Sequence, residues 1–164
     1  ARVQACAIGA SREENARLMA GVYASRGLSA LVFRGANTGL DELTTTDSNQ
    51  VWLVSGGAVV ETTFDARESL GMASSSIEDL AGGEAAENAA VARDVLSGGG
   101  ADAVRDAVAL NVGAGILAWE GLENPVTCSD FEPRMRGAVE RALAALADGS
   151  GARLVERWVA ASNA

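Results

Sequence analysis

Histidine is missing from the sequence of 164 residues. The Ser-His-Asp triad, the Cys-His pair and the imidazole-ligated metal site all need this residue, so these three kinds of active site are excluded. Cysteine is scarce, and Cys6 and Cys128 form no CxxC motif, which excludes a disulfide framework or a cysteine zinc site. The catalytic residues are therefore unknown from composition alone.

Positive charge is also scarce, with 13 Lys and Arg against 22 Asp and Glu, a formal net charge of −9. This balance repels phosphate backbones and disfavours a nucleic-acid partner. A phosphate group can still bind, because one metal ion or one helix N-terminus reverses the local field. Trp52, Trp119 and Trp158 are scattered along the chain, which indicates packing in or beside the core instead of a base-stacking platform.

No hydrophobic run is long enough for a membrane span. The first residues lack the basic segment before an apolar one that marks a signal peptide, so the cytoplasm is the expected location. Apolar residues are present in quantity, at 48% of the chain. This content and length suit one globular domain, which we expect to include residues 1–164.

The first third of the chain has the pattern strand, helix, strand. Short apolar runs at 3–8 and 28–33 flank a segment with helical spacing of apolar residues. Ser11 and Glu14 have the spacing of a capping box at the start of that helix. Two parallel strands joined by a right-handed crossover are therefore expected.

Two further strands, at 50–54 and 59–64, flank Ser55-Gly56-Gly57 and predict an antiparallel hairpin. After Ile77 the chain is helical in pattern. The expected helices are 84–96, 103–119, 131–147 and 154–159. The predicted fold class is α/β, with a mixed, mainly parallel sheet that contains an antiparallel hairpin and is covered by helices.

The loop after Phe33 is the strongest candidate site. Ligands of open α/β sheets bind beyond the carboxyl ends of the strands, and this loop is acidic and long for its position. It carries Asp41 and Glu42 side by side. Mg²⁺ usually takes one or two carboxylates together with substrate phosphates, so the pair suits that ion. An ordinary acidic loop remains the alternative, since neighbouring acids are common in an acidic chain.

Other polar features favour structural roles. Gly82-Gly83 precede a helix, but Glu84 and Glu87 would repel a phosphate there, so a plain helix boundary is expected. Arg105, Asp106 and Asn111 lie within a helical pattern, where buried polar groups need partners. They predict a structural network more than a substrate contact.

The sequence resembles the anthranilate phosphoribosyltransferase family over nearly its whole length. The segments that carry the resemblance include Leu-Met-Ala-Gly-Val at 18–22, Gly-Leu-Asp-Glu-Leu-Thr-Thr-Thr at 39–46, Leu-Ala-Gly-Gly-Glu at 80–84 and Val-Arg-Asp-Ala-Val-Ala-Leu-Asn at 104–111. The resemblance implies the α/β domain of a nucleoside phosphorylase/phosphoribosyltransferase-like fold. It also implies transfer of a phosphoribosyl group from phosphoribosyl pyrophosphate (PRPP) to anthranilate in tryptophan biosynthesis, with Mg²⁺ as cofactor and Asp41 and Glu42 as its ligands.

The sequence lacks three features of this family: the N-terminal helical domain, the glycine-rich pyrophosphate loop and the Lys/His/Asn-rich stretch. Arg34-Gly35 stands where relatives often have His-Gly, and the following stretch is a residue longer. We therefore expect the C-terminal half of such an enzyme, inactive alone, with an N-terminal-half chain or a second copy in a homodimer as possible partners. The alternative is a non-catalytic binding module on the same fold.

Overall fold

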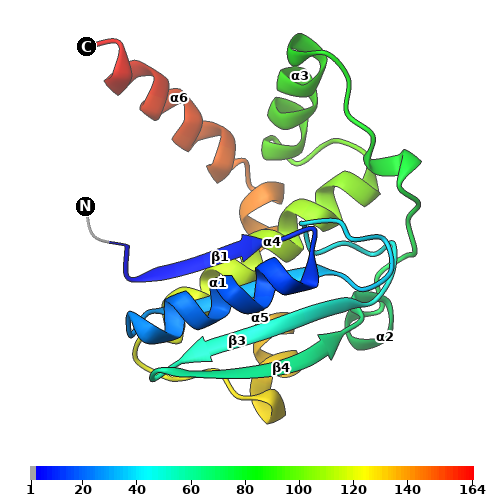
Figure 1. Ribbon diagram of the computed structural model, residues 1–164. Helices are drawn as coiled ribbons and strands as arrows, with labels where there is room; N and C mark the ends of the chain where they lie inside the picture. Colours follow the sequence, from blue (N-terminus) through cyan, green and yellow to red (C-terminus); the bar gives the residue numbers. More distant parts are fainter. Residues whose placement is uncertain (1–2) are drawn as a thin grey trace.

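A four-stranded sheet organises the chain in the computed structural model, which describes residues 3–164 (Figure 1). Its strands follow the order of the sequence across the sheet. They are β1 (Ala5–Gly9), β2 (Ser29–Gly35), β3 (Asn49–Ser55) and β4 (Ala58–Phe64). The helix α1 (Glu13–Ser25) connects β1 to β2. The predicted strand–helix–strand unit is thus confirmed, with β1 and β2 parallel and Ala5 opposite Ser29.

The sheet is mixed, as predicted, but it is not mainly parallel. Among the described strands only β1–β2 is parallel, whereas β2–β3 and β3–β4 are antiparallel. Residues 36–48 between β2 and β3 contain no helix to return the chain to its starting edge, so β3 runs back along β2. The hairpin turn is Gly56-Gly57, whose φ angles of 57° and 79° are those that a tight two-residue turn requires.

The four predicted helices are also confirmed, as α3 (Ala85–Leu96), α4 (Asp102–Glu120), α5 (Cys128–Ala147) and α6 (Ser150–Ser162). The short helix α2 (Ala66–Leu70) and the 3₁₀ turn η1 (Glu78–Leu80) were not predicted. The predicted capping box at Ser11 and Glu14 is wrong. The N-cap of α1 is Arg12, and no side chain caps this helix.

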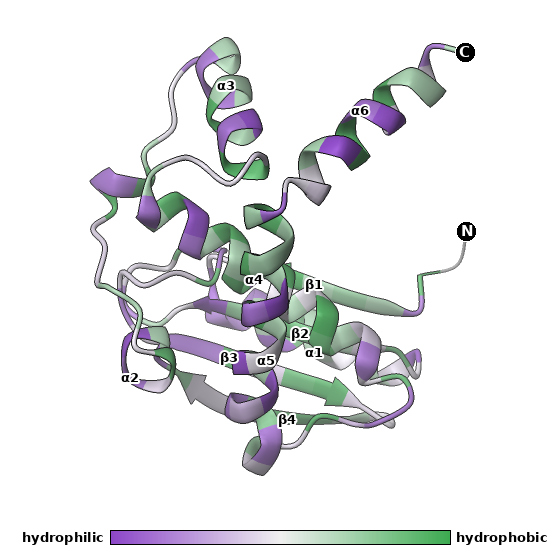
Figure 2. Cartoon of the chain, turned by 180° about the vertical axis from the view of Figure 1, so that it is seen from behind, coloured by the Kyte–Doolittle hydropathy of each residue, from purple (hydrophilic) through white to green (hydrophobic). Residues whose placement is uncertain are grey.

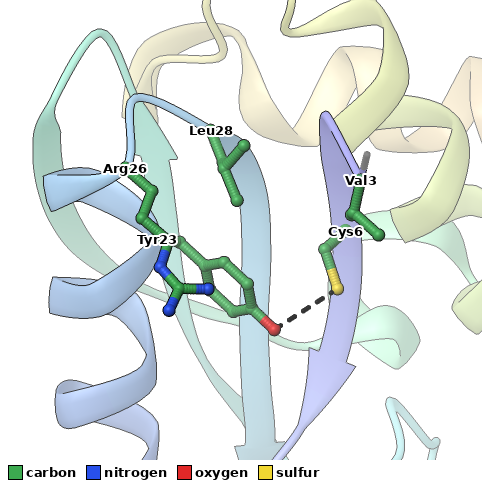
Figure 3. A pocket seen from close by; sticks show the side chains of 5 residues that line it. All are labelled: Val3, Cys6, Tyr23, Arg26 and Leu28. Carbon is green, nitrogen blue, oxygen red and sulfur yellow. Dashed lines mark hydrogen bonds between the residues drawn. The ribbon is translucent and has the colours of Figure 1, made fainter. Parts of the chain in front are cut away.

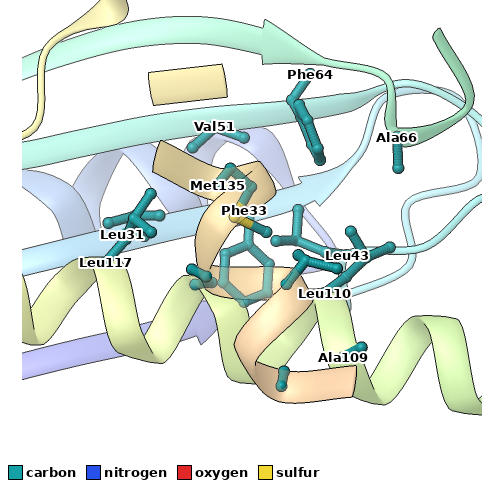
Figure 4. Packing of buried hydrophobic residues seen from close by; sticks show 14 of the residues in the cluster. Leu31, Phe33, Leu43, Val51, Phe64, Ala66, Ala109, Leu110, Leu117 and Met135 are labelled. Carbon is teal, nitrogen blue, oxygen red and sulfur yellow. The ribbon is translucent and has the colours of Figure 1, made fainter. Parts of the chain in front are cut away.

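Helices cover both faces of the sheet, and each face has its own core. Alternation along β2 sends Leu31 and Phe33 towards α4 and α5, where they meet Leu110, Leu117 and Met135 (Figure 4). The opposite face is smaller and packs against α1 through residues that include Ala16, Ala20, Val32 and Trp52. Burial of one such large apolar side chain contributes roughly 1.5–3 kcal/mol, so these two layers hold the sheet in place.

The C-terminal helix α6 departs from this packing. None of its residues is buried, and hydrophobic and hydrophilic residues alternate along it (Figure 2). Trp158 on α6 is 73% exposed, and Trp119 at the end of α4 is 65% exposed. Of the three tryptophans predicted to pack in or beside the core, only Trp52 does so. Within residues 3–164, no helix is long and apolar enough to cross a membrane.

Candidate functional site

The acidic pair lies at the carboxyl ends of the two parallel strands. Asp41 and Glu42 are both exposed, in the loop that follows β2. The loop is seated directly on the end of β1: a Cβ atom on Gly9 would lie 1.3 Å from the carbonyl oxygen of Asp41. Only glycine permits so close an approach of two backbones. The predicted position of the pair at this rim of the sheet is therefore confirmed.

Backbone bonds and one buried carboxylate shape the first half of the loop. The N–H of Gly35 donates to the carbonyl oxygen of Leu40 at 2.8 Å. The carboxylate of Asp47 accepts from the N–H groups of Asn37 and Thr38 at 2.7 and 2.9 Å. Asp47 is itself buried, so these bonds replace the water that its charge would otherwise attract. The loop thus has a defined conformation up to the acidic pair.

Two asparagines fix the chain just after the pair. Asn111 on α4 accepts from the N–H of Leu43 at 3.2 Å and donates to the carbonyl oxygen of Leu43 at 2.9 Å. The fully buried Asn49 accepts from the N–H of Thr44 at 3.3 Å and donates to its carbonyl oxygen at 3.1 Å. The structural role expected for Asn111 is confirmed, and its partner is the residue next to Glu42.

The side chain of Arg34 also forms hydrogen bonds that support the fold. Its guanidinium group donates to Oε1 of Gln50 at 2.5 Å and to the carbonyl oxygen of Ala36 at 3.2 Å. Its Nε donates to the carbonyl oxygen of Ser11 at 3.4 Å. The side chain therefore connects β3 to the loops that leave β1 and β2. It reinforces the base of the acidic loop.

Electrostatics make the pair receptive to a cation. Partial desolvation, followed by the charge and the hydrogen-bonding proximity of Asp41, raises the pKa of Glu42. A divalent ion would relieve that repulsion. None of the ion pairs found within residues 3–164 involves either acid. The same residues contain no cluster of three or more metal-ligating side chains, so a bound Mg²⁺ would keep several waters or take phosphate oxygens.

The glycine pair before α3 forms a helix boundary, as predicted. The N–H of Gly83 donates to Oδ1 of Asn88 at 2.8 Å, and the N–H of Glu84 donates to the carboxylate of Glu87 at 3.3 Å. These donors are those that a phosphate would need, and side chains of α3 already occupy them. An anion site at this position is therefore unsupported.

A hollow at the opposite end of the parallel strands contains different chemistry (Figure 3). Val3, Cys6, Tyr23, Arg26 and Leu28 line it. The thiol of Cys6 donates to Oη of Tyr23 at 3.6 Å. Burial and this contact raise the pKa of Tyr23 to about 12, so the phenol stays neutral. The hollow lies at the strand starts, away from the acidic pair at the strand ends.

The fold and the rim site define a class of protein. Residues 1–152 match the family described as "Glycosyl transferase family, a/b domain", and the chain belongs to this family.

Within the family, the chain is similar to anthranilate phosphoribosyltransferases. It is 48% identical over 160 residues to that of Arthrobacter sp. (strain FB24), an alignment that covers 98% of the chain and 44% of the relative. It is 44% identical to that of Nocardia farcinica, over 99% of the chain and 47% of the relative. The chain thus spans about half the length of the curated relatives that it matches.

Solved structures of anthranilate phosphoribosyltransferases are also similar to the chain. The anthranilate phosphoribosyltransferase of Thermus thermophilus superposes with a TM-score of 0.78 at 33% identity, over 95% of this chain and 42% of that one. The Saccharomyces cerevisiae enzyme in complex with PRPP and Mg superposes with a TM-score of 0.74 at 20% identity, over 92% and 40% of the two chains. The second likeness concerns the fold alone.

Proposed function

We propose that the chain supplies the Mg²⁺-binding loop of an anthranilate phosphoribosyltransferase, which transfers a phosphoribosyl group from PRPP to anthranilate in tryptophan biosynthesis. The observation that carries this proposal is the seating of Asp41 and Glu42 on the ends of β1 and β2. Ligands of α/β sheets gather at that rim. The 48% identity with the Arthrobacter relative supports the choice of substrates.

The chemistry of such a transfer needs charge neutralisation more than covalent help. Positive charge develops at the sugar carbon while pyrophosphate leaves, and Mg²⁺ would stabilise the leaving group. Asp41 and Glu42 would hold the ion through carboxylate oxygens. Asn111 and Asp47 would keep the loop in one conformation on either side of the pair. The residues of this chain thus bind and orient the leaving group.

Further parts of the active site would come from a segment outside this chain. The chain spans 44% of the Arthrobacter relative, so we propose that an N-terminal-half chain or a second copy contributes the remaining substrate contacts. Residues 1–164 would form one α/β domain of that assembly. A cytoplasmic location belongs to the same proposal, because PRPP carries several charges and does not cross a bilayer unaided.

A chimaera tests the proposed function. The chain replaces the matching part of the Arthrobacter relative, and turnover is measured with PRPP, anthranilate and Mg²⁺. The expected result is transferase activity that falls roughly 10- to 100-fold in Asp41→Asn and Glu42→Gln, with partial recovery at high Mg²⁺. Glu78→Gln is the control, because Glu78 is an exposed acid on the η1 turn. An inactive chimaera, or acid variants that match this control, would contradict the proposal.

Titration of the isolated chain with Mg²⁺ and pyrophosphate distinguishes part of a transferase from a non-catalytic binding module. A transferase part should bind pyrophosphate only with Mg²⁺ present, and this binding should disappear in Asp41→Asn. A pure interaction module should bind neither. Calorimetry on the unmodified chain and on the Glu78→Gln control gives the comparison.

A further inference from the structure

The chain just beyond the acidic pair is also held by a segment far along the sequence. The hydroxyl groups of Thr45 and Ser75 share a hydrogen bond of 2.9 Å, although the two residues are 30 positions apart. The main-chain N–H of Ser75 also donates to the carbonyl oxygen of Thr45, at 3.3 Å. Because one bond joins side chains and the other joins backbones, the pair fixes both the distance and the orientation of the two segments.

Ser75 lies in residues 71–84, the segment that connects α2 to α3 and contains the short η1 turn (Figure 1). Within 73–79 every other residue is exposed, whereas Ser75 is half-buried. Thr45 is only 2% exposed, so its hydroxyl group needs a hydrogen-bond partner within the protein. Ser75 supplies that partner, which explains why this one side chain of the connecting segment is partly covered.

The neighbouring serine makes different contacts. The N–H and the hydroxyl group of Ser76 donate to the carboxylate of Asp79 at 2.8 and 2.9 Å. These bonds stay within the connecting segment, where they support the η1 turn. Ser75 and Ser76 therefore have the same side chain at adjacent positions, but of the two it is Ser75 that is hydrogen-bonded to the acidic loop.

Ser75 completes a series of three supports for this loop. Leu43 and Thr44, which lie between the acidic pair and Thr45, are held by asparagine side chains of α4 and β3. Three successive residues are thus fixed from three separate parts of the chain. A segment held in this way loses its conformational freedom when the protein folds, so little remains to be lost when the adjacent acids bind an ion.

We propose that Ser75 is a positioning residue for the magnesium site: through Thr45 it holds the backbone that places Asp41 and Glu42 for a Mg²⁺–diphosphate group. The inference rests on the proposed function for the identity of this ligand. Loss of the Ser75 hydroxyl group leaves the buried hydroxyl of Thr45 without its partner. The resulting shift of the backbone reaches the acidic pair through the two residues between them.

Binding of pyrophosphate in the presence of Mg²⁺, measured by calorimetry on the 164-residue chain, tests the proposal. Ser75→Ala should weaken this binding roughly 3- to 10-fold, as expected for the loss of one hydrogen bond. Ser76→Ala is the matched control and should bind as the unmodified chain does, because it breaks bonds inside the connecting segment. Ser75→Thr, which keeps a hydroxyl group, should retain most of the affinity. Equal weakening in Ser75→Ala and Ser76→Ala overturns the proposal.

A double-mutant cycle tests whether Ser75 acts through Thr45. Thr45→Val removes the other hydroxyl group of the pair and should weaken the binding of pyrophosphate with Mg²⁺ as Ser75→Ala does. When both substitutions are combined, the second should have little further effect, because the bond is already lost. Fully additive effects of the two substitutions on binding overturn the proposed route.

Hydrogen exchange gives a measurement that needs no ligand. The amides of Leu43 and Thr44 donate to side chains of α4 and β3, so they should be protected in the unmodified chain. They should exchange about threefold faster or more in Ser75→Ala but not in Ser76→Ala. Equal exchange at these two amides in the two variants overturns the proposal.

The results separate the positioning role from the proposed function. If the unmodified chain binds no pyrophosphate with Mg²⁺, the proposed function is contradicted, and exchange at Leu43 and Thr44 then decides whether Ser75 holds the acidic loop. If the unmodified chain binds pyrophosphate and Ser75→Ala binds it equally well, the positioning role is overturned and the proposed function stands.

Discussion

Gly9 determines how closely the acidic loop approaches the sheet. We predict that Gly9→Ala displaces the Asp41 carbonyl, because the added methyl group would lie 1.3 Å from that oxygen. The expected cost is about 1–3 kcal/mol of the free energy of unfolding, as for an overpacked core position. The chimaera carrying this variant should also need more Mg²⁺ for half-maximal activity. Urea unfolding and Mg²⁺ titration measure the two effects.

Gly21 provides the matched control for this substitution. It lies on α1, and a Cβ atom there would meet no heavy atom within 4 Å. Gly21→Ala should leave the Mg²⁺ requirement unchanged and raise stability by roughly 0.5–1 kcal/mol, because alanine favours the helix. Equal behaviour of the two variants would contradict the contact between Gly9 and the loop.

Asn111 leads to a second prediction at this scale. Asn111→Ala leaves the N–H and C=O of Leu43 without their side-chain partner, which should cost about 1–3 kcal/mol of stability. The Mg²⁺ requirement of the chimaera should rise, because Leu43 follows Glu42 directly. Val112→Ala, at an exposed position of the same helix, should change neither quantity. An unaltered Mg²⁺ requirement in Asn111→Ala would show that the hydrogen bonds between Asn111 and Leu43 stabilise the fold without affecting the acidic pair.

At the scale of single residues, the sequence predicts the position of Asp41 and Glu42 but not the contacts that hold their loop in place. Asp41 and Glu42 follow a predicted strand, so their place at the rim could be anticipated from the order of elements. The contact of Gly9 with Asp41 and that of Asn111 with Leu43 join residues far apart in the sequence. No local pattern contains such pairs, because they arise only after the helices and strands have packed.

Among the elements, α2 depends on its N-cap. Asp65 accepts from the N–H of Arg67 at 2.9 Å and forms an ion pair with the guanidinium group of the same residue. We predict that Asp65→Ala lowers the free energy of unfolding by roughly 0.5–2 kcal/mol at neutral pH. Glu68→Ala, in the same short helix, is the control and should have a smaller effect. Urea unfolding compares the two variants.

The pH dependence of this effect follows from the ionisation of Asp65. Arg67 holds the pKa of the Asp65 carboxyl below its ordinary value, so the charged form is favoured in the folded chain. The stabilisation is therefore complete above the unfolded pKa of about 3.9 and is lost as the pH falls through the folded value. The stability difference between the unmodified chain and Asp65→Ala should narrow below about pH 4. A constant difference into strong acid would contradict this assignment.

The elements themselves were largely predictable, whereas their ends and directions were less so. The apolar runs predicted all four strands and the long helices. The start of α5 was predicted at Phe131, but the helix begins at Cys128, because Thr127 and Asp130 form a capping box that extends it. The mainly parallel sheet was wrong for another reason. Strand direction depends on the connection between β2 and β3, and its irregular loop has no period to read.

At the scale of the whole molecule, α6 contributes little to the stability of the chain. None of its residues is buried, so a truncation after Gly149 should change the free energy of unfolding by less than about 1 kcal/mol. Leu146→Ala is the contrast, because Leu146 is 5% exposed and its loss should cost about 2–5 kcal/mol. A large loss of stability on truncation would show that α6 packs more tightly than its exposure indicates.

Exposure was the property of the whole molecule that the sequence predicted least well. Tryptophan is usually buried to a large extent, which favoured packing for all three. Trp119 and Trp158 instead lie on the surface, where the last turn of α4 and the projecting α6 place them. Residue type indicates whether a side chain favours burial, whereas the path of the backbone determines whether other residues cover it.

The contact between Gly9 and the Asp41 carbonyl also has an evolutionary consequence. Two segments that share one backbone contact cannot change independently. In a library of random variants of the chimaera selected for transferase activity, replacements at position 9 should survive only beside a second change that moves residues 40–42 outward. The first strand and the acidic loop would therefore be inherited as a pair, although some thirty residues of chain lie between them.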